Sequence, residues 1–138
     1  MKSFVIFRLY GFSRNLRSEI NRKVKIYFYD LGVRNTLINN FNGLSLRNDA
    51  GAIFESYVVS EMVKREANKP QKANFYFWRT HEQKELDLIS EKNGVVTAYE
   101  IKLSKPRKIA GFVTFKKLYP ESSTKLITKE NVLAELTF

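Results

Sequence analysis

Residues 84–103, KELDLISEKNGVVTAYEIKL, predict two short strands joined by a tight turn. An Asn-Gly pair divides the stretch, and both residue types tolerate the positive φ that a two-residue hairpin turn requires. Apolar and polar residues alternate on either side of the turn, as in strands with one buried face. On the first strand this alternation places Leu86 and Leu88 on one face and Asp87 on the other. The stretch therefore predicts a hairpin within a sheet.

Three charged side chains are expected to meet on one face of this hairpin. Glu100 and Lys102 lie two residues apart on the second strand, so they share a face. Pairing across the hairpin would set Asp87 near Glu100, while Ile101 projects from the opposite face. The hairpin thus predicts two carboxylates and one ammonium group side by side.

This arrangement costs free energy unless a counter-charge compensates it. Two half-buried carboxylates repel each other, which drives one of them towards protonation. Lys102 offsets part of the repulsion, and a divalent cation would offset more, because hard cations such as Mg²⁺ prefer carboxylate oxygens. The alternative is a surface salt bridge between Lys102 and one carboxylate on a solvated face. The spacing leaves both interpretations open.

The composition favours a polyanionic partner. The chain has 138 residues and a formal net charge of +10, from 24 basic and 14 acidic residues. Such a balance indicates nucleic acid before membrane, with ordinary solubilising charge as the alternative. The absence of cysteine and the single histidine exclude a thiolate nucleophile, a disulfide framework and a multi-histidine metal site. No apolar run reaches the roughly 18 residues of a membrane span. We expect a cytoplasmic protein with no membrane partner, and its oligomeric state stays open.

The order of periodic segments predicts an α/β fold with a mixed central sheet flanked by helices. We expect a single domain over residues 1–138, with an N-terminal β/α extension over 1–48 and a core over 49–138. The tail 131–138 either packs or frays. Besides the hairpin, strands are expected over 3–10, 24–30, 74–80 and 124–128, helices over 31–41, 50–67 and 111–119, and basic connections over 13–23 and 104–110.

Glu55 is the anomaly of the helix expected over residues 50–67. A charge on the core-facing stripe of a helix needs a partner or a ligand. Glu55 could otherwise lie at the edge of the stripe or pair with a buried arginine. Its neighbours one turn away along the helix are all apolar or glycine: Gly51, Ala52, Val58 and Val59.

Together, Glu55, Asp87 and the Glu-x-Lys of the second hairpin strand resemble the PD-(D/E)XK nuclease superfamily. From residue 50 the order helix, three strands, helix, strand is similar to the αβββαβ core of that restriction-endonuclease-like fold. The resemblance implies that Asp87 and Glu100 bind a catalytic Mg²⁺ or Mn²⁺, with the carbonyl of Ile101 as a further ligand. It also implies that Lys102 assists the attacking water and that Glu55 completes the metal site.

Four stretches are similar to one particular group of proteins. They resemble the C-terminal domain of prokaryotic AAA-type ATPases, a domain commonly labelled as of unknown function. The resemblance covers about Phe4 to Asn131, and G-x-x-x-x-G-K-[ST] is absent from the chain. It implies either the C-terminal part of a longer ATPase or a stand-alone relative, with an AAA-type ATPase module as a partner in the first case. The stretches are KIYFYDLGVRNTLI, LRNDAGAIFESYVVSE, FYFWRTHEQKELDLI and TAYEIK.

We therefore expect a metal-dependent endonuclease that hydrolyses phosphodiester bonds of DNA. The alternative is a catalytically silent domain that binds nucleic acid or protein and serves an attached ATPase, and a purely structural adaptor would leave Glu55 unexplained. Glu85 is either an extra metal ligand or a solvated rim carboxylate. Phosphate contacts are expected from basic residues beside the hairpin, for which plain solvation is the alternative: Arg79, Lys105, Arg107 and Lys108.

Overall fold

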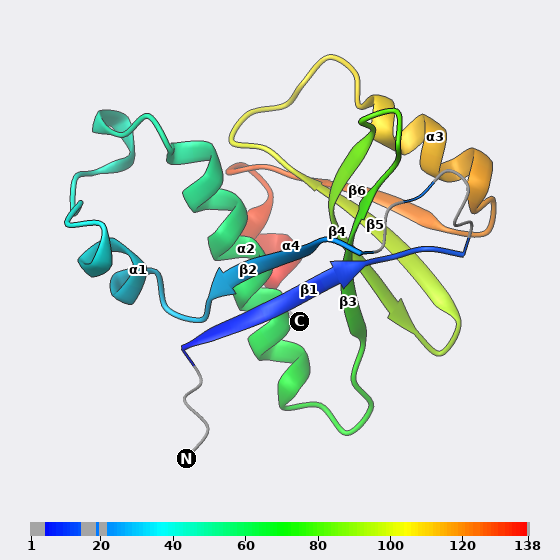
Figure 1. Cartoon of the computed structure of the whole chain (residues 1–138), viewed down its shortest axis with the longest axis horizontal. Coiled ribbons are helices and arrows are strands. Elements are labelled where there is room, and N and C mark those ends of the chain that lie inside the picture. The colour runs from blue at the N-terminus through cyan, green and yellow to red at the C-terminus, as the bar shows by residue number, and fades with distance from the viewer. Residues whose placement is uncertain (1–4, 15–18, 20–21, 138) are drawn as a thin grey trace.

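The computed structural model describes residues 5–14, 19 and 22–137 (Figure 1). The ends of the expected strand 3–10 and of the tail, at residues 3, 4 and 138, lie outside this part, as do residues 15–18 and 20–21 of the basic connector. A turn of 3-10 helix covers Leu44–Leu46. The strands are β1 (Ile6–Gly11), β2 (Val24–Phe28), β3 (Asn74–Arg79), β4 (Glu85–Lys92), β5 (Val95–Ile101) and β6 (Ser123–Ile127), and the helices are α1 (Leu31–Leu37), α2 (Ala50–Ala67), α3 (Ala110–Leu118) and α4 (Val132–Leu136).

The strands form a six-stranded sheet in the order β2-β1-β3-β4-β5-β6. The pairs β1–β3 and β5–β6 are parallel, and the remaining neighbours are antiparallel. The predicted mixed α/β fold and the order helix, three strands, helix, strand from residue 50 are confirmed. The N-terminal extension adds two strands, β1 and β2, to the same sheet.

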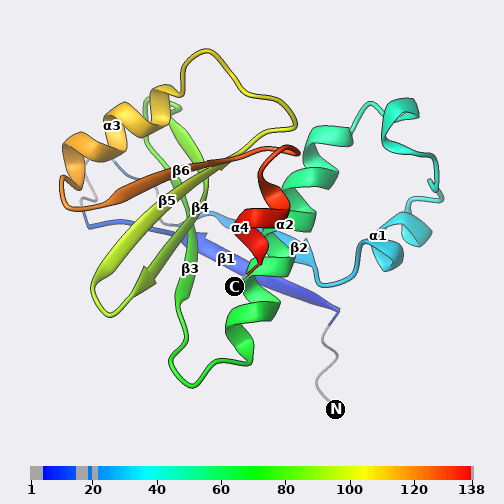
Figure 2. The same cartoon turned by 180° about the vertical axis from the view of Figure 1, so that it is seen from behind.

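Helices cover both faces of the sheet (Figures 1 and 2). Helices α2 and α4 lie side by side on one face, where Val58, Leu88 and Leu136 belong to one apolar cluster. Helix α3 lies on the other face, where Phe115 packs with Trp78 in a second cluster. Because Leu136 of α4 is buried, the C-terminal tail packs against the core. None of the helices in the described part of the chain is long and apolar enough to cross a membrane.

A bulge in β4 overturns one prediction about the hairpin. Tyr76 of β3 pairs with Ile89, but Trp78 pairs with Leu86, so two steps along β3 oppose three along β4. Leu88 therefore packs under α2 while Leu86 packs under α3. The predicted shared face of these leucines is wrong, because the extra residue shifts the alternation between them.

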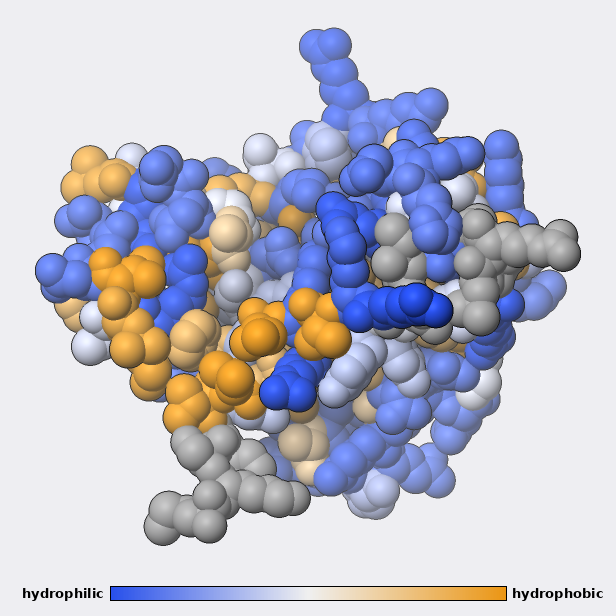
Figure 3. All heavy atoms as spheres, viewed as in Figure 1, coloured by the Kyte–Doolittle hydropathy of each residue, from blue (hydrophilic) through white to orange (hydrophobic). Residues whose placement is uncertain are grey.

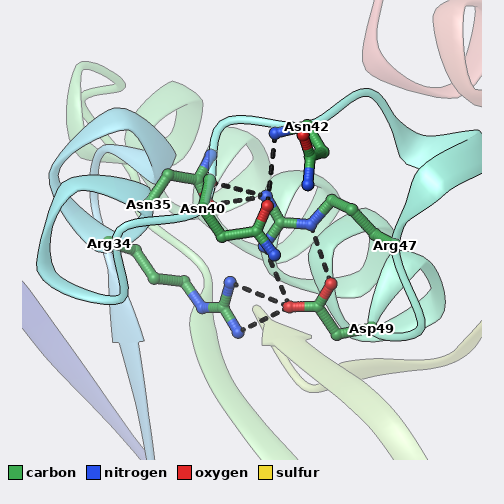
Figure 4. Close-up of polar contacts among 6 residues, drawn as sticks. All are labelled: Arg34, Asn35, Asn40, Asn42, Arg47 and Asp49. Carbon is green, nitrogen blue, oxygen red and sulfur yellow. Dashed lines mark hydrogen bonds and ion pairs between the residues drawn. The ribbon is translucent and has the colours of Figure 1, made fainter.

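Helix α2 has the predicted bounds, and side-chain contacts of Asp49 with two arginines lie at its start (Figure 4). Asp49 makes no side-chain capping bond to the helix. Its carboxylate instead accepts from Arg47 Nε at 2.8 Å, and Arg34 of α1 contacts it at 3.4 Å. Arg47 also donates to the carbonyl of Asn40 at 2.9 Å. The hydrogen bond from Arg47 lowers the pKa of Asp49 to about 2. This network joins α1, the loop after it and α2.

Apolar side chains gather over the outer face of β1 and β2 and over α1 (Figure 3). The register of these strands places Tyr10 beside Val24 and Arg8 beside Ile26 on that face. The side chains of Tyr10 and Ile26 are 52% and 59% exposed. The extension thus buries one face against α2 and leaves the other largely open.

Candidate active site

The predicted charged residues meet where β4 begins and β5 ends. Leu88 pairs with Tyr99 in the hairpin, and Asp87 and Glu100 come one residue further along each strand. The backbone N–H of Ile101 donates to Asp87 Oδ2 at 2.8 Å. The bulge in β4 lies at this point, and bulges commonly redirect a side chain beside a functional site.

Lys102 covers the two carboxylates from the solvent side. Its Nζ lies 2.8 Å from Glu100 Oε1 and 4.0 Å from Asp87 Oδ2. The side chain of Lys102 is 48% exposed, whereas those of Glu100 and Asp87 are 10% and 9% exposed. A solvated surface salt bridge does not describe this arrangement, because both carboxylates are buried.

One oxygen of Glu100 has no hydrogen-bond partner in the described part of the chain. Glu100 Oε2 is buried and makes no hydrogen bond to any residue that the structure describes. Leaving a buried carboxylate oxygen unpaired is costly, so such an atom calls for a ligand, an ion or a water.

The electrostatics of the site oppose a fully ionised, metal-free state. Burial raises the pKa of Asp87 to about 7, assisted by the charges of Glu55 and Glu100 and opposed by the Ile101 N–H and by Lys102. Burial alone would lower the pKa of Lys102, but its hydrogen bond to Glu100 and the neighbouring carboxylates raise it overall. At neutral pH the lysine is therefore protonated, while Asp87 is close to its titration midpoint.

Glu55 of α2 has partners that the sequence did not indicate. Tyr27 Oη donates to Glu55 Oε1 at 2.7 Å, and Lys25 Nζ lies 3.7 Å from the same oxygen. Both come from β2, so the suggested buried arginine is not the partner. Lys25 and Tyr27 are two residues apart and share a strand face, which the sequence could show. Their position beside α2 depends on the sheet order, which it could not.

The side chain of Glu85 is 34% exposed and pairs with two basic side chains. Its Oε1 lies 2.8 Å from Lys25 Nζ, and its Oε2 lies 3.3 Å from Arg79 Nη2. Arg79, expected to contact phosphate, is thus bound to a carboxylate in this structure.

The predicted basic residues after β5 lie on an exposed loop before α3. Lys105, Arg107 and Lys108 are all exposed. Lys108 also lines a hollow of about 330 Å³, together with Glu100 and Lys102. A larger hollow of about 450 Å³ lies at the opposite end of the hairpin, and none of the site carboxylates lines it.

The pair Asp87 and Glu100 is the set best suited to a metal. Among residues 5–14, 19 and 22–137, no three side chains of His, Cys, Asp or Glu form a ready-made metal-binding group. Glu55 is already bound by Tyr27 and Lys25, so Asp87 and Glu100 are the two carboxylates that can coordinate a cation directly. Their hard oxygen atoms and the unpaired Glu100 Oε2 fit Mg²⁺ or Mn²⁺ chemically.

Residues 50–135 match the family described as "Domain of unknown function (DUF4143)". Because the match spans well over half of the 138 residues, the chain belongs to this family, a domain found with AAA-type ATPases. The matched region includes the helix and hairpin that carry the carboxylates, and it leaves β1 and β2 outside.

Two curated relatives are similar to the chain: the uncharacterised protein Mb2031c of Mycobacterium bovis and the uncharacterised protein Rv2008c of Mycobacterium tuberculosis. Each is 30% identical to it over 102 residues, which make up 72% of this chain and 22% of the relative. The chain thus spans about a fifth of the length of these relatives. No solved structure matches it.

Proposed function

We propose that this chain is a metal-dependent nuclease domain of the PD-(D/E)XK type that hydrolyses phosphodiester bonds of DNA. The observation that carries the proposal is the buried Glu100 carboxylate: its Oε1 lies 2.8 Å from Lys102 Nζ, and its Oε2 has no hydrogen-bond partner among the described residues. The order α2, β3, β4, β5, α3, β6 supports it, because the αβββαβ core of that superfamily has the same order.

Asp87 and Glu100 would hold Mg²⁺ or Mn²⁺, with the carbonyl oxygen of Ile101 as the proposed third ligand. When bound, such a cation lowers the pKa of a coordinated water and neutralises charge on the phosphate oxygens. The backbone N–H of Ile101 donates a hydrogen bond of 2.8 Å to Asp87 Oδ2. This bond orients the carboxylate before a metal binds. Glu55 would contribute indirectly, because its negative charge raises the pKa of Asp87.

Lys102 acts as a proton-bearing group. Because neighbouring carboxylates raise its pKa, it carries a proton at neutral pH. It can therefore orient the attacking water by a hydrogen bond and offset the charge that develops on the scissile phosphate. The carboxylates would in turn hold its ammonium group next to the reacting atoms.

DNA is the proposed substrate because of charge. The chain carries a net charge of +10, and Lys105, Arg107 and Lys108 are exposed on the loop that follows the site. Such residues neutralise backbone phosphates without reading sequence. An AAA-type ATPase module, of the kind that occurs with this family, is the proposed partner in a longer protein.

A catalytically silent binding domain is the second candidate. The contacts of Glu55 favour it, because Tyr27 and Lys25 occupy the helical carboxylate that would otherwise complete the metal site. In that case the domain would bind nucleic acid or protein for the attached ATPase and turn over no substrate.

Cleavage of supercoiled plasmid and of branched and single-stranded oligonucleotides, with Mg²⁺, Mn²⁺ or EDTA, separates the two functions. We expect metal-dependent cleavage that falls at least about 100-fold in Asp87→Asn and Lys102→Met. Lys92→Met is the matched control, because Lys92 lies at the far end of β4 and pairs with Glu66. No cleavage of any substrate, or equal loss in the control, would reject the nuclease assignment.

A further inference from the structure

We propose that Lys25 limits the site to one divalent cation, because its ammonium group occupies the position that a second cation would take between Glu55 and Glu85. This inference rests on the proposed function, since it concerns how many metal ions the same site takes. Nothing in the match to the family predicts it, because residues 50–135 exclude β2.

Three elements hold the ammonium group of Lys25. Its Nζ lies 2.8 Å from Glu85 Oε1 on β4 and 3.7 Å from Glu55 Oε1 on α2. It also lies 5.4 Å from the ring centroid of Phe77 on β3, a cation–π contact. The lysine side chain is 27% exposed, so it is partly withdrawn from water. A cation held by two carboxylate oxygens and a ring face occupies a defined position.

The balance of charge explains why this position matters. Four carboxylates lie in and around the site, and Asp87 feels the charges of both Glu55 and Glu100. Lys102 and one divalent cation would carry three positive charges against the two negative charges of Asp87 and Glu100, so these two carboxylates need no further cation. Without Lys25, Glu55 and Glu85 would keep only Arg79, on Glu85, as an ion-pair partner among the described residues. Two under-compensated carboxylates favour a hard divalent cation.

Titration of the whole chain with Mn²⁺, followed by calorimetry and by the electron paramagnetic resonance signal of free Mn²⁺, tests the proposal. We expect one bound Mn²⁺ per chain for the wild type and two for Lys25→Met. Lys25→Arg keeps the positive charge and should bind one. Lys23→Met is the matched control, an exposed lysine two residues earlier in the chain, and should also bind one.

Glu55→Gln in the Lys25→Met background should return the stoichiometry to one, because it removes a ligand of the new position. Two ions in the wild type would overturn the proposal without any variant, and so would one ion in both the wild type and a folded Lys25→Met. If the wild type binds none, the proposed nuclease site fails. The role of Lys25 would then still stand if Lys25→Met gains one ion, and would fail if it gains none.

Discussion

Asp87 and Glu100 lie buried beside each other, and the ammonium group of Lys102 is their shared counter-charge. The pKa of Asp87 is raised from 3.8 to about 7, chiefly by burial and then by the charges of Glu55 and Glu100. A carboxyl group with a raised pKa holds its proton more tightly in the folded than in the unfolded chain. The metal-free protein therefore loses stability as the pH rises from about 4 to about 7.

Asp87→Asn should remove this pH dependence. An amide cannot ionise, yet its oxygen can still accept from the Ile101 N–H. We expect the variant to be more stable than the wild type by about 1–3 kcal/mol at pH 8 with EDTA, and close to it at pH 4.5. Urea unfolding at the two pH values measures the difference. An equal difference in the free energy of unfolding at both pH values would contradict the claim that ionised Asp87 destabilises the folded chain.

Asp49→Asn is a control in which the effect on stability should have the opposite sign. The pKa of Asp49 is lowered from 3.8 to about 2, first by the hydrogen bond from Arg47. Its carboxylate therefore contributes stability above about pH 4, which is lost as the pH falls towards 2. This variant should be less stable than the wild type at pH 8, with the gap closing in acid.

At the level of elements, the site depends on the close approach of α3 to β4. Gly111 lies on the buried side of α3, and a Cβ atom there would lie 2.6 Å from the carbonyl oxygen of Glu85 and 2.9 Å from Leu86 Cδ2. The backbone of β4 at that point leads directly into Asp87. The missing side chain therefore allows α3 to pack at this distance.

Gly111→Ala should destabilise the chain by about 1–3 kcal/mol, because a backbone oxygen cannot move aside cheaply. Gly51→Ala in α2 is the matched control, since nothing lies within 4 Å of its added Cβ. That change should stabilise by about 0.5–1 kcal/mol, the gain of alanine over glycine in a helix. Urea unfolding compares the two, and a neutral Gly111→Ala would show that α3 can shift away from β4.

Most helices and strands were predictable to within a few residues because their periodicities are local. Helix α4 was not, because its five residues are too few to show a helical period, and the tail was expected only to pack or fray. Helix α2 begins and ends where its apolar spacing does, and the Asn-Gly turn sets the hairpin. The bulge was not predictable, since Leu86-Asp87-Leu88 reads as perfect alternation. Nor was the contribution of β2, because Lys25 reaches Glu55 only through pairing between segments distant in the chain.

On the scale of the whole molecule, the acidic site lies within a basic protein. The net charge is +10, although the site brings four carboxylates close together. The exposed loop between β5 and α3 places positive charge beside them. We expect this loop to hold backbone phosphates in position for the site.

Replacing Lys105, Arg107 and Lys108 together by Gln should weaken DNA binding and flatten its dependence on salt. Each lost phosphate contact reduces the slope of log affinity against log salt by about 0.9. Fluorescence anisotropy with Ca²⁺ in place of Mg²⁺, at several salt concentrations, measures both. The charge-matched control replaces three other exposed lysines, Lys72, Lys117 and Lys129. Equal effects of the two triple variants would mean that net charge, and not this loop, determines binding.

The most direct test of the central claim is the anomalous scattering of Mn²⁺ in crystals of the chain. We predict an anomalous peak in contact with the carboxylates of both Asp87 and Glu100, beside the ammonium group of Lys102, and no such peak in crystals of Glu100→Gln. A peak elsewhere, or none at Mn²⁺ concentrations that saturate binding in solution, would contradict the assignment of these residues as the metal site.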